Sequence, residues 1–199
     1  MQWFIWGLLA VGVVYLAVTF NRLVSLNKRA DGAWSDIDVQ LKRRWDLIPA
    51  LVETVSGYAR HESETLQRVV AARSGATQAA SLKDRGRNEL DLSSAVSRLF
   101  AVAEAYPDLK ANQNFQNLQQ NLVDVENQIQ HARRYYNAVI RDYNTLIQGF
   151  PSVLAAKVTG FGERAFFQID AEERSTPQVD LGSSSSGSAR RAESKELDR

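Results

Sequence analysis

The sequence contains no cysteine among its 199 residues. This absence excludes disulfide bonds, cysteine metal ligands, thiol chemistry and a lipoprotein anchor. It does not choose a cellular compartment, because the reduced cytosol and an oxidising exterior both tolerate a cysteine-free chain. Net charge is nearly absent too, since 24 Lys and Arg residues against 23 Asp and Glu residues leave +1 at pH 7. The global charge therefore does not indicate a nucleic-acid partner.

Charged side chains are missing from the first 20 residues. Residues 3–20 form an apolar run that would cover about 27 Å as a helix, close to the ~30 Å hydrocarbon core of a bilayer. Trp3 and Trp6 fall where the aromatic belt of a membrane protein is found. We predict a transmembrane helix over residues 1–20, in contact with membrane lipid through residues 3–20. A cleaved signal peptide is the alternative, but the run lacks a preceding basic segment and a following small-residue cleavage site.

Basic residues follow this apolar run, and no basic side chain precedes it. The first of them are Arg22, Lys28 and Arg29. The positive-inside rule then predicts that the N-terminus lies outside and that the C-terminal domain lies in the cytoplasm. The expected location is the cell (inner) membrane, with a single crossing.

The stretch that follows, residues 21–73, has apolar residues at helical spacing. Steps of three and four dominate from Leu23 to Val70, which predicts a helix continuous with the membrane span, without a linker. Several apolar positions are doubled, so the stripe is wider than the seam of a two-stranded coiled coil and indicates a helix that faces two neighbours in a bundle. Pro49 interrupts the stretch and predicts a kink over residues 44–48.

Three further helices are expected after this stretch. Residues 76–87 mix small, polar and basic residues without a clear period, so we predict a solvated loop there. A second helix is expected to begin near Asn88 and to be ended by Pro107. The third is indicated by an unbroken heptad pattern, typical of coiled coils, over residues 115–146. A short fourth helix fits residues 152–159.

The C-terminal part of the chain changes in composition. Four apolar residues after the fourth helix should fold back onto the bundle: Phe161, Phe166, Phe167 and Ile169. Residues 175–199 are Ser-rich with mixed charge and are predicted to form a disordered tail. The predicted fold class is therefore all-α. A transmembrane helix (residues 1–20) continues into an antiparallel bundle of three long helices and a short fourth (residues 21–174).

Several short motifs occur in one order between residues 20 and 170. They are Ala33-Trp34-Ser-Asp-Ile37, Asp46-Leu-Ile-Pro49, Tyr58-Ala-Arg-His61-Glu62, Tyr106-Pro107-Asp-Leu109, Arg134-Tyr-Tyr136-Asn137, Tyr143-Asn144 and Phe150-Pro151. In their order and spacing they resemble the LemA family. The resemblance implies a membrane-anchored antiparallel helical bundle with its N-terminus outside and no established enzyme activity. It also implies a scaffold or adaptor protein of bacterial membranes.

The dipeptide His61-Glu62 invites comparison with the HExxH zinc motif, in which two histidines lie one turn apart on a helix. The second histidine position is Thr65 here, and the sequence's other histidine, His131, belongs to a different predicted helix. One histidine and one glutamate do not make a zinc site, so we predict no metal and no other cofactor. We expect Glu62 to lie on the apolar stripe of the first long helix and to pair with a basic group.

Charged residues gather next to Pro49, and one of them falls at a buried position. The charged residues are Arg43, Arg44 and Asp46, and Arg44 lies on the seam of the predicted helix. A buried unpaired charge is very costly, so Arg44 needs a carboxylate, and the candidates are Asp38, Asp46 and Asp142. We expect a polar contact that fixes the register of the bundle. The alternative is a polar surface that recognises another protein or phospholipid headgroups.

Two Tyr-Asn pairs, Tyr136-Asn137 and Tyr143-Asn144, lie seven residues apart and share one face of the predicted third helix. Tyrosine can bury its ring and offer its hydroxyl for a hydrogen bond. We expect internal hydrogen bonds from these residues to the first long helix, with a ligand role as the alternative.

A role in protein–protein interaction fits these features best. A rigid helix leaving the membrane, near-neutral charge, and Gly7 and Gly12 in the span favour a scaffold or adaptor that forms homo-oligomers and contacts other membrane proteins. The alternative is a sensor or adaptor that relays a signal along the first helix, with the Pro49 kink as its moving part. An enzyme is not expected, because the sequence offers no evident cluster of nucleophiles, acid–base pairs or metal ligands, and it indicates no small-molecule substrate.

Overall fold

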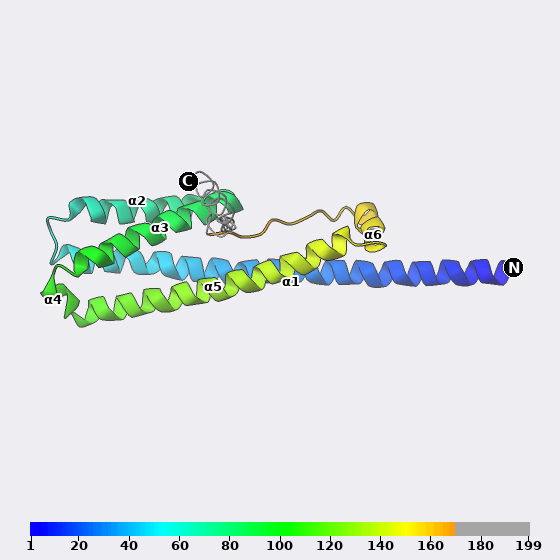
Figure 1. Cartoon of the computed structure of the whole chain (residues 1–199), viewed down its shortest axis with the longest axis horizontal. Coiled ribbons are helices and arrows are strands. Elements are labelled where there is room, and N and C mark those ends of the chain that lie inside the picture. Colours follow the sequence, from blue (N-terminus) through cyan, green and yellow to red (C-terminus); the bar gives the residue numbers. More distant parts are fainter. Residues whose placement is uncertain (170–199) are drawn as a thin grey trace, which may run out of the picture.

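The computed structural model describes residues 1–169, and within that range the chain forms six helices and no strand. In order they are α1 (Gln2–Ser56), α2 (Ser63–Gln78), α3 (Leu82–Ala103), α4 (Pro107–Lys110), α5 (Gln113–Gln148) and α6 (Ser152–Thr159). Figure 1 shows the long helices aligned along one axis, with one end of α1 protruding. The prediction of an all-α bundle is confirmed. The predicted tail over residues 175–199 lies outside the described residues.

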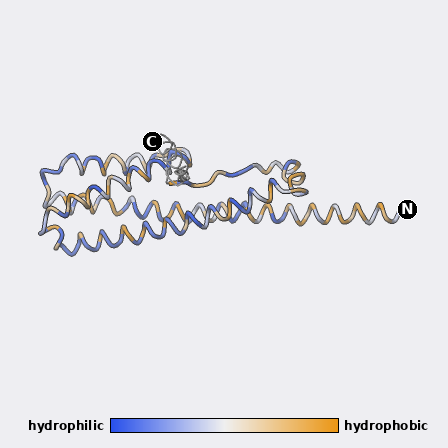
Figure 2. The backbone as a smooth tube through the Cα atoms, viewed as in Figure 1, coloured by the Kyte–Doolittle hydropathy of each residue, from blue (hydrophilic) through white to orange (hydrophobic). Residues whose placement is uncertain are grey.

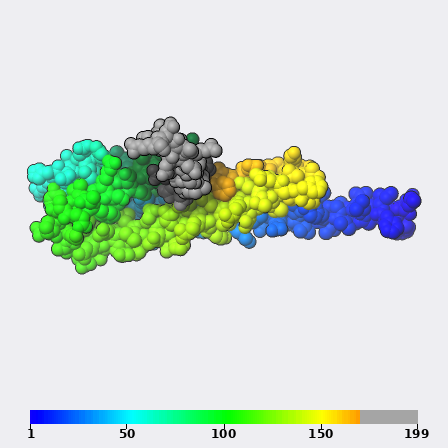
Figure 3. Space-filling view, viewed as in Figure 1, coloured from blue at the N-terminus to red at the C-terminus, as the bar shows by residue number. Residues whose placement is uncertain are grey.

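Helix α1 runs without interruption for 55 residues, from the apolar N-terminal segment through Pro49 to Ser56. The large apolar side chains of residues 3–18 are exposed, and this part of α1 projects alone from the body of the molecule (Figure 3). By length and composition the helix can cross a membrane. From Ala30 to Val55 its buried residues recur every three or four positions and face the bundle, and Leu23 is buried two turns before Ala30. The bend expected near Pro49 stays a prediction.

Helix α5 is the main partner of α1 and runs antiparallel to it (Figure 1). Its start is fixed by Asn112, whose Oδ1 accepts a hydrogen bond from the backbone N–H of Phe115 at 3.1 Å. Seven of its nine buried residues lie at the predicted heptad positions, and the other two are Ile140 and Ile147. Ile129 and Tyr136 belong to one apolar cluster with Ile37 of α1. The helix predicted over residues 115–146 is therefore confirmed.

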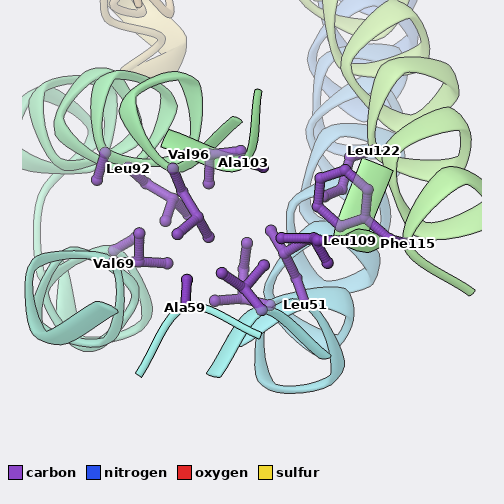
Figure 4. Close-up of a cluster of buried hydrophobic side chains, with 14 residues drawn as sticks. Leu51, Ala59, Val69, Leu92, Val96, Ala103, Leu109, Phe115 and Leu122 are labelled. Carbon is purple, nitrogen blue, oxygen red and sulfur yellow. The ribbon is translucent and has the colours of Figure 1, made fainter. Parts of the chain in front are cut away.

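The first long helix ends at Ser56, so the prediction that it continues to residue 73 is wrong. Residues 60–65 are all polar and cannot continue a buried stripe. Instead, the backbone N–H of Ala59 bonds to the carbonyl of Val55 at 2.9 Å, and that of Glu62 to the carbonyl of Ala59 at 3.1 Å, which turns the chain. Helix α2 then folds back onto α1 and α3, and Val69 enters their shared core (Figure 4).

Helix α3 begins at Leu82 rather than near Asn88, so the loop predicted over residues 76–87 is mostly helical. Ser81 caps α3, since its Oγ accepts a hydrogen bond from the backbone N–H of Asp84 at 3.0 Å. The first turns of α3 pack closely against the C-terminal segment at Gly86. A Cβ added to Gly86 would lie 2.1 Å from the carbonyl oxygen of Gln168. The helix ends at Ala103, and Pro107 starts the separate α4.

After α6 the chain returns as an extended segment, residues 161–169, which we call the strap. Gly160, with φ 76°, ends α6 in the left-handed conformation that glycine adopts without strain. The strap runs back past α1 and α5 towards the start of α3 (Figure 1). Phe167 and Ile169 are buried as predicted, whereas Phe166 is exposed. The predicted return of this segment onto the bundle is therefore correct for its inward-facing residues.

The bundle consists of two halves built on the same α1–α5 pair. In the distal half, α2, α3 and α4 cover the pair and enclose the largest apolar cluster (Figure 4). In the proximal half, next to the apolar N-terminal segment, α6 and the strap take their place. Four helices were expected, and six occur in residues 1–169, because residues 57–62 divide the first predicted helix and Pro107 starts a further short one.

Candidate functional site: a buried charge network and a strap

Arg44 is almost fully buried in the middle of the bundle, at 5% exposure. Its guanidinium lies 3.1 Å from Glu126 Oε2 on α5 and 3.4 Å from Glu89 Oε2 on α3, and it donates a hydrogen bond to Ser93 Oγ at 2.7 Å. The prediction that Arg44 pairs with Asp38, Asp46 or Asp142 is therefore wrong. Arg44 nevertheless has the carboxylate contacts that a buried charge needs, and they join α1 to α3 and α5.

Glu89 is the most deeply buried member of this group, with no exposed surface. Its Oε1 accepts a hydrogen bond from the indole Nε1–H of Trp45 at 2.7 Å. Burial raises the pKa of Glu89, while the charge of Arg44 and the Trp45 hydrogen bond act in the opposite direction. One arginine thus faces two carboxylates, so the Arg44 network (Arg44, Trp45, Glu89, Ser93 and Glu126) is rich in negative charge.

A groove of about 420 Å³ opens above this network between α3 and α5. Its lining combines polar and apolar side chains: Arg44, Ser93, Val96, Ser97, Phe100, Leu122, Val123, Glu126 and Asn127. The groove therefore has apolar walls and a charged end.

Pro49 has a structural consequence that the sequence reading missed. Proline has no N–H, so the carbonyl of Trp45, four residues earlier, loses its helical hydrogen bond. Arg73 of α2 replaces it, because its Nε–H donates to the Trp45 carbonyl oxygen at 2.7 Å. The break in the α1 hydrogen-bond ladder is thus satisfied from a neighbouring helix. Arg43 and Asp46, which flank this place, are exposed.

His61 and Glu62 lie in the turn between α1 and α2 and not on the α1 stripe. Glu62 accepts a long hydrogen bond of 3.4 Å from the hydroxyl of Tyr106. Within residues 1–169 no ion pair includes Glu62, so the predicted basic partner is not found in this range. Burial and the neighbouring Glu62 carboxylate both raise the pKa of Tyr106. His61 is exposed. Over the described range, no group of three or more potential metal ligands converges.

The two Tyr-Asn pairs of α5 bind the strap and not the first helix, which corrects the sequence expectation. The hydroxyls of Tyr136 and Tyr143 donate to the backbone carbonyls of Ala165 and Gly162, each at 3.1 Å. Burial raises the pKa of both tyrosines, so both hydroxyls remain protonated donors at neutral pH.

The asparagines of these pairs each make two hydrogen bonds to a single strap residue. Asn137 donates to the carbonyl of Phe167 at 3.0 Å and accepts from its N–H at 2.9 Å. Asn144 does the same with Arg164, at 2.9 and 3.0 Å. The spacings agree, because seven residues of helix rise about 10.5 Å and three residues of extended chain span about 10 Å. A heptad of Tyr-Asn pairs therefore forms a ladder for an extended chain.

The strap also reaches α1, through the side chains of Arg164 and Phe167. The guanidinium of Arg164 donates to Asp31 Oδ1 at 2.7 Å and to Asn27 Oδ1 at 2.9 Å. The buried ring of Phe167 meets the Trp34 indole edge-on, with 5.2 Å between ring centres. Tyr136 contacts the same indole, and the guanidinium of Arg85 on α3 lies 5.5 Å above it. Trp34 thus joins α1, α3, α5 and the strap.

These features define a helical-bundle protein whose first helix extends into an apolar segment long enough to cross a membrane. Residues 33–181 match the LemA family, and the chain belongs to that family. The predicted family resemblance is thereby confirmed. The apolar α1 segment is consistent with a membrane location.

The chain is also similar to several curated proteins. Magnetosome protein MamQ 1 and magnetosome protein MamQ 2 of Paramagnetospirillum magneticum are each 25% identical to it over 182 residues, which cover 78% of this chain and 67% of theirs. Protein LemA of Metamycoplasma hominis is 24% identical over 173 residues, covering 84% of this chain and 78% of its own. The chain thus spans about two thirds of the length of the MamQ proteins.

Proposed function

We propose that the protein is a membrane-anchored helical scaffold or adaptor that acts through protein–protein interaction and self-association. The observation that carries this proposal is the continuity of α1, whose 55 residues correspond to about 83 Å of helix. Its first part exposes apolar side chains, and its second part is the central element of the bundle core. An anchor and a binding platform are therefore held at a fixed distance.

The bundle in this proposal is cytoplasmic and attached to the cell (inner) membrane. Arg22, Lys28 and Arg29 directly follow the apolar segment, and the positive-inside rule favours their retention in the cytoplasm. The proposed contact surface includes the exposed Arg43 and Asp46, whose charges are not used inside the bundle. Arg44 is buried in its own network and is not available to a partner.

Purification of the full chain from its native membrane in mild detergent tests this proposal. The mass of the particle would be measured by light scattering over a series of concentrations, and accompanying proteins would be identified by mass spectrometry. We expect a particle heavier than one 22.3 kDa chain after correction for detergent, together with a reproducible partner protein. A lone monomer at all concentrations, without any partner, would contradict the scaffold.

A pair of variants tests the proposed contact surface. Replacing both Arg43 and Asp46 by Ala should reduce the recovered partner several-fold and leave helix content and thermal unfolding unchanged, because both side chains are exposed. Glu53→Ala is the matched control, since Glu53 is an exposed charged residue further along α1. Equal partner recovery from both variants would place the contact elsewhere on the bundle.

A further inference from the structure

Helix α6 has the reverse of the usual arrangement of apolar residues. A helix on the surface of a water-soluble bundle turns its large apolar side chains towards the core. In α6 the buried residues are small, namely Ser152, Ala155 and Ala156. The large ones point outward: Leu154 is 55% exposed, Val158 is 88% exposed, and Phe150, in the turn before the helix, is 85% exposed. Exposure of these side chains to water is unfavourable in proportion to the apolar area that each exposes.

The position of α6 along α1 coincides with the end of the apolar segment. Ala156 packs in one cluster with Leu23, and the ring of Phe161, just after α6, lies 6.1 Å from that of Phe20. Thr19 is buried, although the α1 side chains before it are exposed. Phe20 is the last residue of the apolar run, and Arg22 is the first charged side chain. Helix α6 therefore sits at the boundary between the apolar and the charged part of α1.

The direction of α6 fits the same boundary. Figure 1 shows α6 lying crosswise to α1, at the point where α1 leaves the bundle. Figure 2 shows hydrophobic residues on α6 and along the protruding part of α1, while polar residues dominate the distal helices. If α1 crosses a bilayer, a helix crosswise to it at this level lies in the plane of the membrane surface, where short apolar faces insert to the acyl boundary.

We propose that α6 and the preceding Phe150-Pro151 turn form a second membrane contact, in which Phe150, Leu154 and Val158 insert into the lipid surface beside α1. Lys157 is exposed on the same helix and Arg22 on α1, and both suit the phosphate groups of anionic lipids at that depth. The inference rests on the proposed anchoring of α1. Two contacts, one spanning and one interfacial, fix the depth of the bundle and the tilt of α1 in the bilayer.

A lipid surface explains the exposed face better than a second copy of the chain does. The apolar surface of α6 is continuous with that of α1 through Phe20 and Phe161. The same apolar environment should therefore cover both surfaces. A bilayer that surrounds residues 3–20 already reaches the level of α6. The small buried residues allow α6 to dock closely on α1 and α5, and this close docking keeps its outward face beside the span.

The absence of cysteine makes this inference directly testable, because an introduced cysteine is the single labelling site. Val158→Cys, Leu9→Cys and Val70→Cys would each carry an environment-sensitive fluorophore on the full chain, reconstituted in phosphatidylcholine vesicles containing phosphatidylglycerol. All three positions are exposed, so the substitutions leave the core intact. Lipids carrying a nitroxide at a shallow or a deep acyl position then report the depth of each label.

We expect the Val158 label to show blue-shifted emission and several-fold stronger quenching by the shallow nitroxide than the Val70 label on α2. The Leu9 label should be quenched best by the deep nitroxide. If the Leu9 label is quenched and the Val158 label behaves like the Val70 label, the α6 contact is wrong while the anchor stands. If neither is quenched, the anchor itself and the proposed function fail. A Val158 label that is shielded only at high protein-to-lipid ratios, without lipid quenching, would assign the face to a second copy and overturn the inference.

Discussion

The two halves of the bundle complete the same α1–α5 pair by different physical means. In the distal half, α2 and α3 bury apolar side chains around a charged network whose centre is Arg44. In the proximal half, an extended strap is held mainly by uncharged hydrogen bonds from two Tyr-Asn pairs, and its ion pair, Arg164 with Asp31, is partly exposed. Charged groups in a core must stay paired to avoid a large penalty, whereas neutral hydrogen bonds contribute about 0.5–1.5 kcal/mol each. The distal half should therefore be the more sensitive to single substitutions, and the proximal half the more easily opened.

The largest effect is expected for Arg44→Met. Removing the guanidinium leaves the fully buried Glu89 carboxylate without its counter-charge, which should lower the free energy of unfolding by about 3–5 kcal/mol. The measurement is urea unfolding of the full chain in mild detergent, followed by circular dichroism. The matched variant adds Glu89→Gln, which removes the orphaned charge and keeps the acceptor for Trp45. Most of the loss should then be recovered; no recovery would mean that the packing of Arg44, and not its charge, holds the distal half together.

A smaller and local effect is expected for Asn137→Ala. This change removes two hydrogen bonds to Phe167 and should cost about 1–3 kcal/mol. Amide hydrogen exchange at Phe167 and Arg164 should accelerate, while exchange in α2 and α3 stays unchanged. Asn121→Ala is the control, because Asn121 is an exposed asparagine on the same helix. Faster exchange in α2 and α3 would show that the two halves open together and would break the comparison.

The sequence made α5 and the buried stripe of α1 predictable and left the partners of this pair open. Helix α5 carries an unbroken heptad pattern, so its bounds followed from residues close together in the chain. The need of Arg44 for a carboxylate followed from its seam position. The identity of that carboxylate did not, because Glu89 is 45 residues away and lies inside a helix whose start was placed too late. The Ser81-Leu-Lys-Asp84 sequence resembles a capping box and could have indicated the earlier start.

The strap could not be derived from periodicity, because an extended segment bound by side chains has none. The seven-residue repeat of Tyr-Asn is visible in the sequence. Its two asparagines bind Arg164 and Phe167, which are three residues apart, and this pairing can be found only if the chain is known to fold back along α5. The end of α1 at Ser56 cannot be derived from periodicity for a related reason: the apolar stripe resumes at Leu66 in helical register, although residues 60–65 are polar. In both cases a long-range contact decided the local conformation.

A third prediction concerns the join between α1 and α2. Arg73→Met removes the donor that satisfies the Trp45 carbonyl and should cost about 1–2 kcal/mol. In a Pro49→Ala background the new N–H of residue 49 supplies that hydrogen bond within α1, so the same change should cost less. Urea unfolding of the wild type, the two single variants and the double variant gives the coupling free energy between Arg73 and Pro49. Arg68→Met, which breaks an exposed pair with Glu64 on the same helix, should change stability by no more than about 0.5 kcal/mol. Equal costs of Arg73→Met in both backgrounds would show that Arg73 acts independently of the proline.

The smallest expected effect is the pH dependence that Glu89 gives to the distal half. Burial holds the pKa of Glu89 above its usual value of 4.5, so the folded chain binds more protons than the unfolded chain between 4.5 and the raised pKa. The stabilising contribution of protonated Glu89 is complete below pH 4.5 and is lost as the pH rises through the raised pKa. Glu89→Gln lacks this titration.

Urea unfolding of the wild-type chain and of Glu89→Gln at a series of pH values isolates this contribution. The difference in free energy of unfolding should shift in favour of the variant as the pH rises. A difference that shifts the other way would mean that the attraction of Arg44 outweighs burial. The charged network would then stabilise the folded state at neutral pH. The distal half would differ from the strap because its polar contacts contribute more to the free energy of unfolding, and not because burial makes them unfavourable.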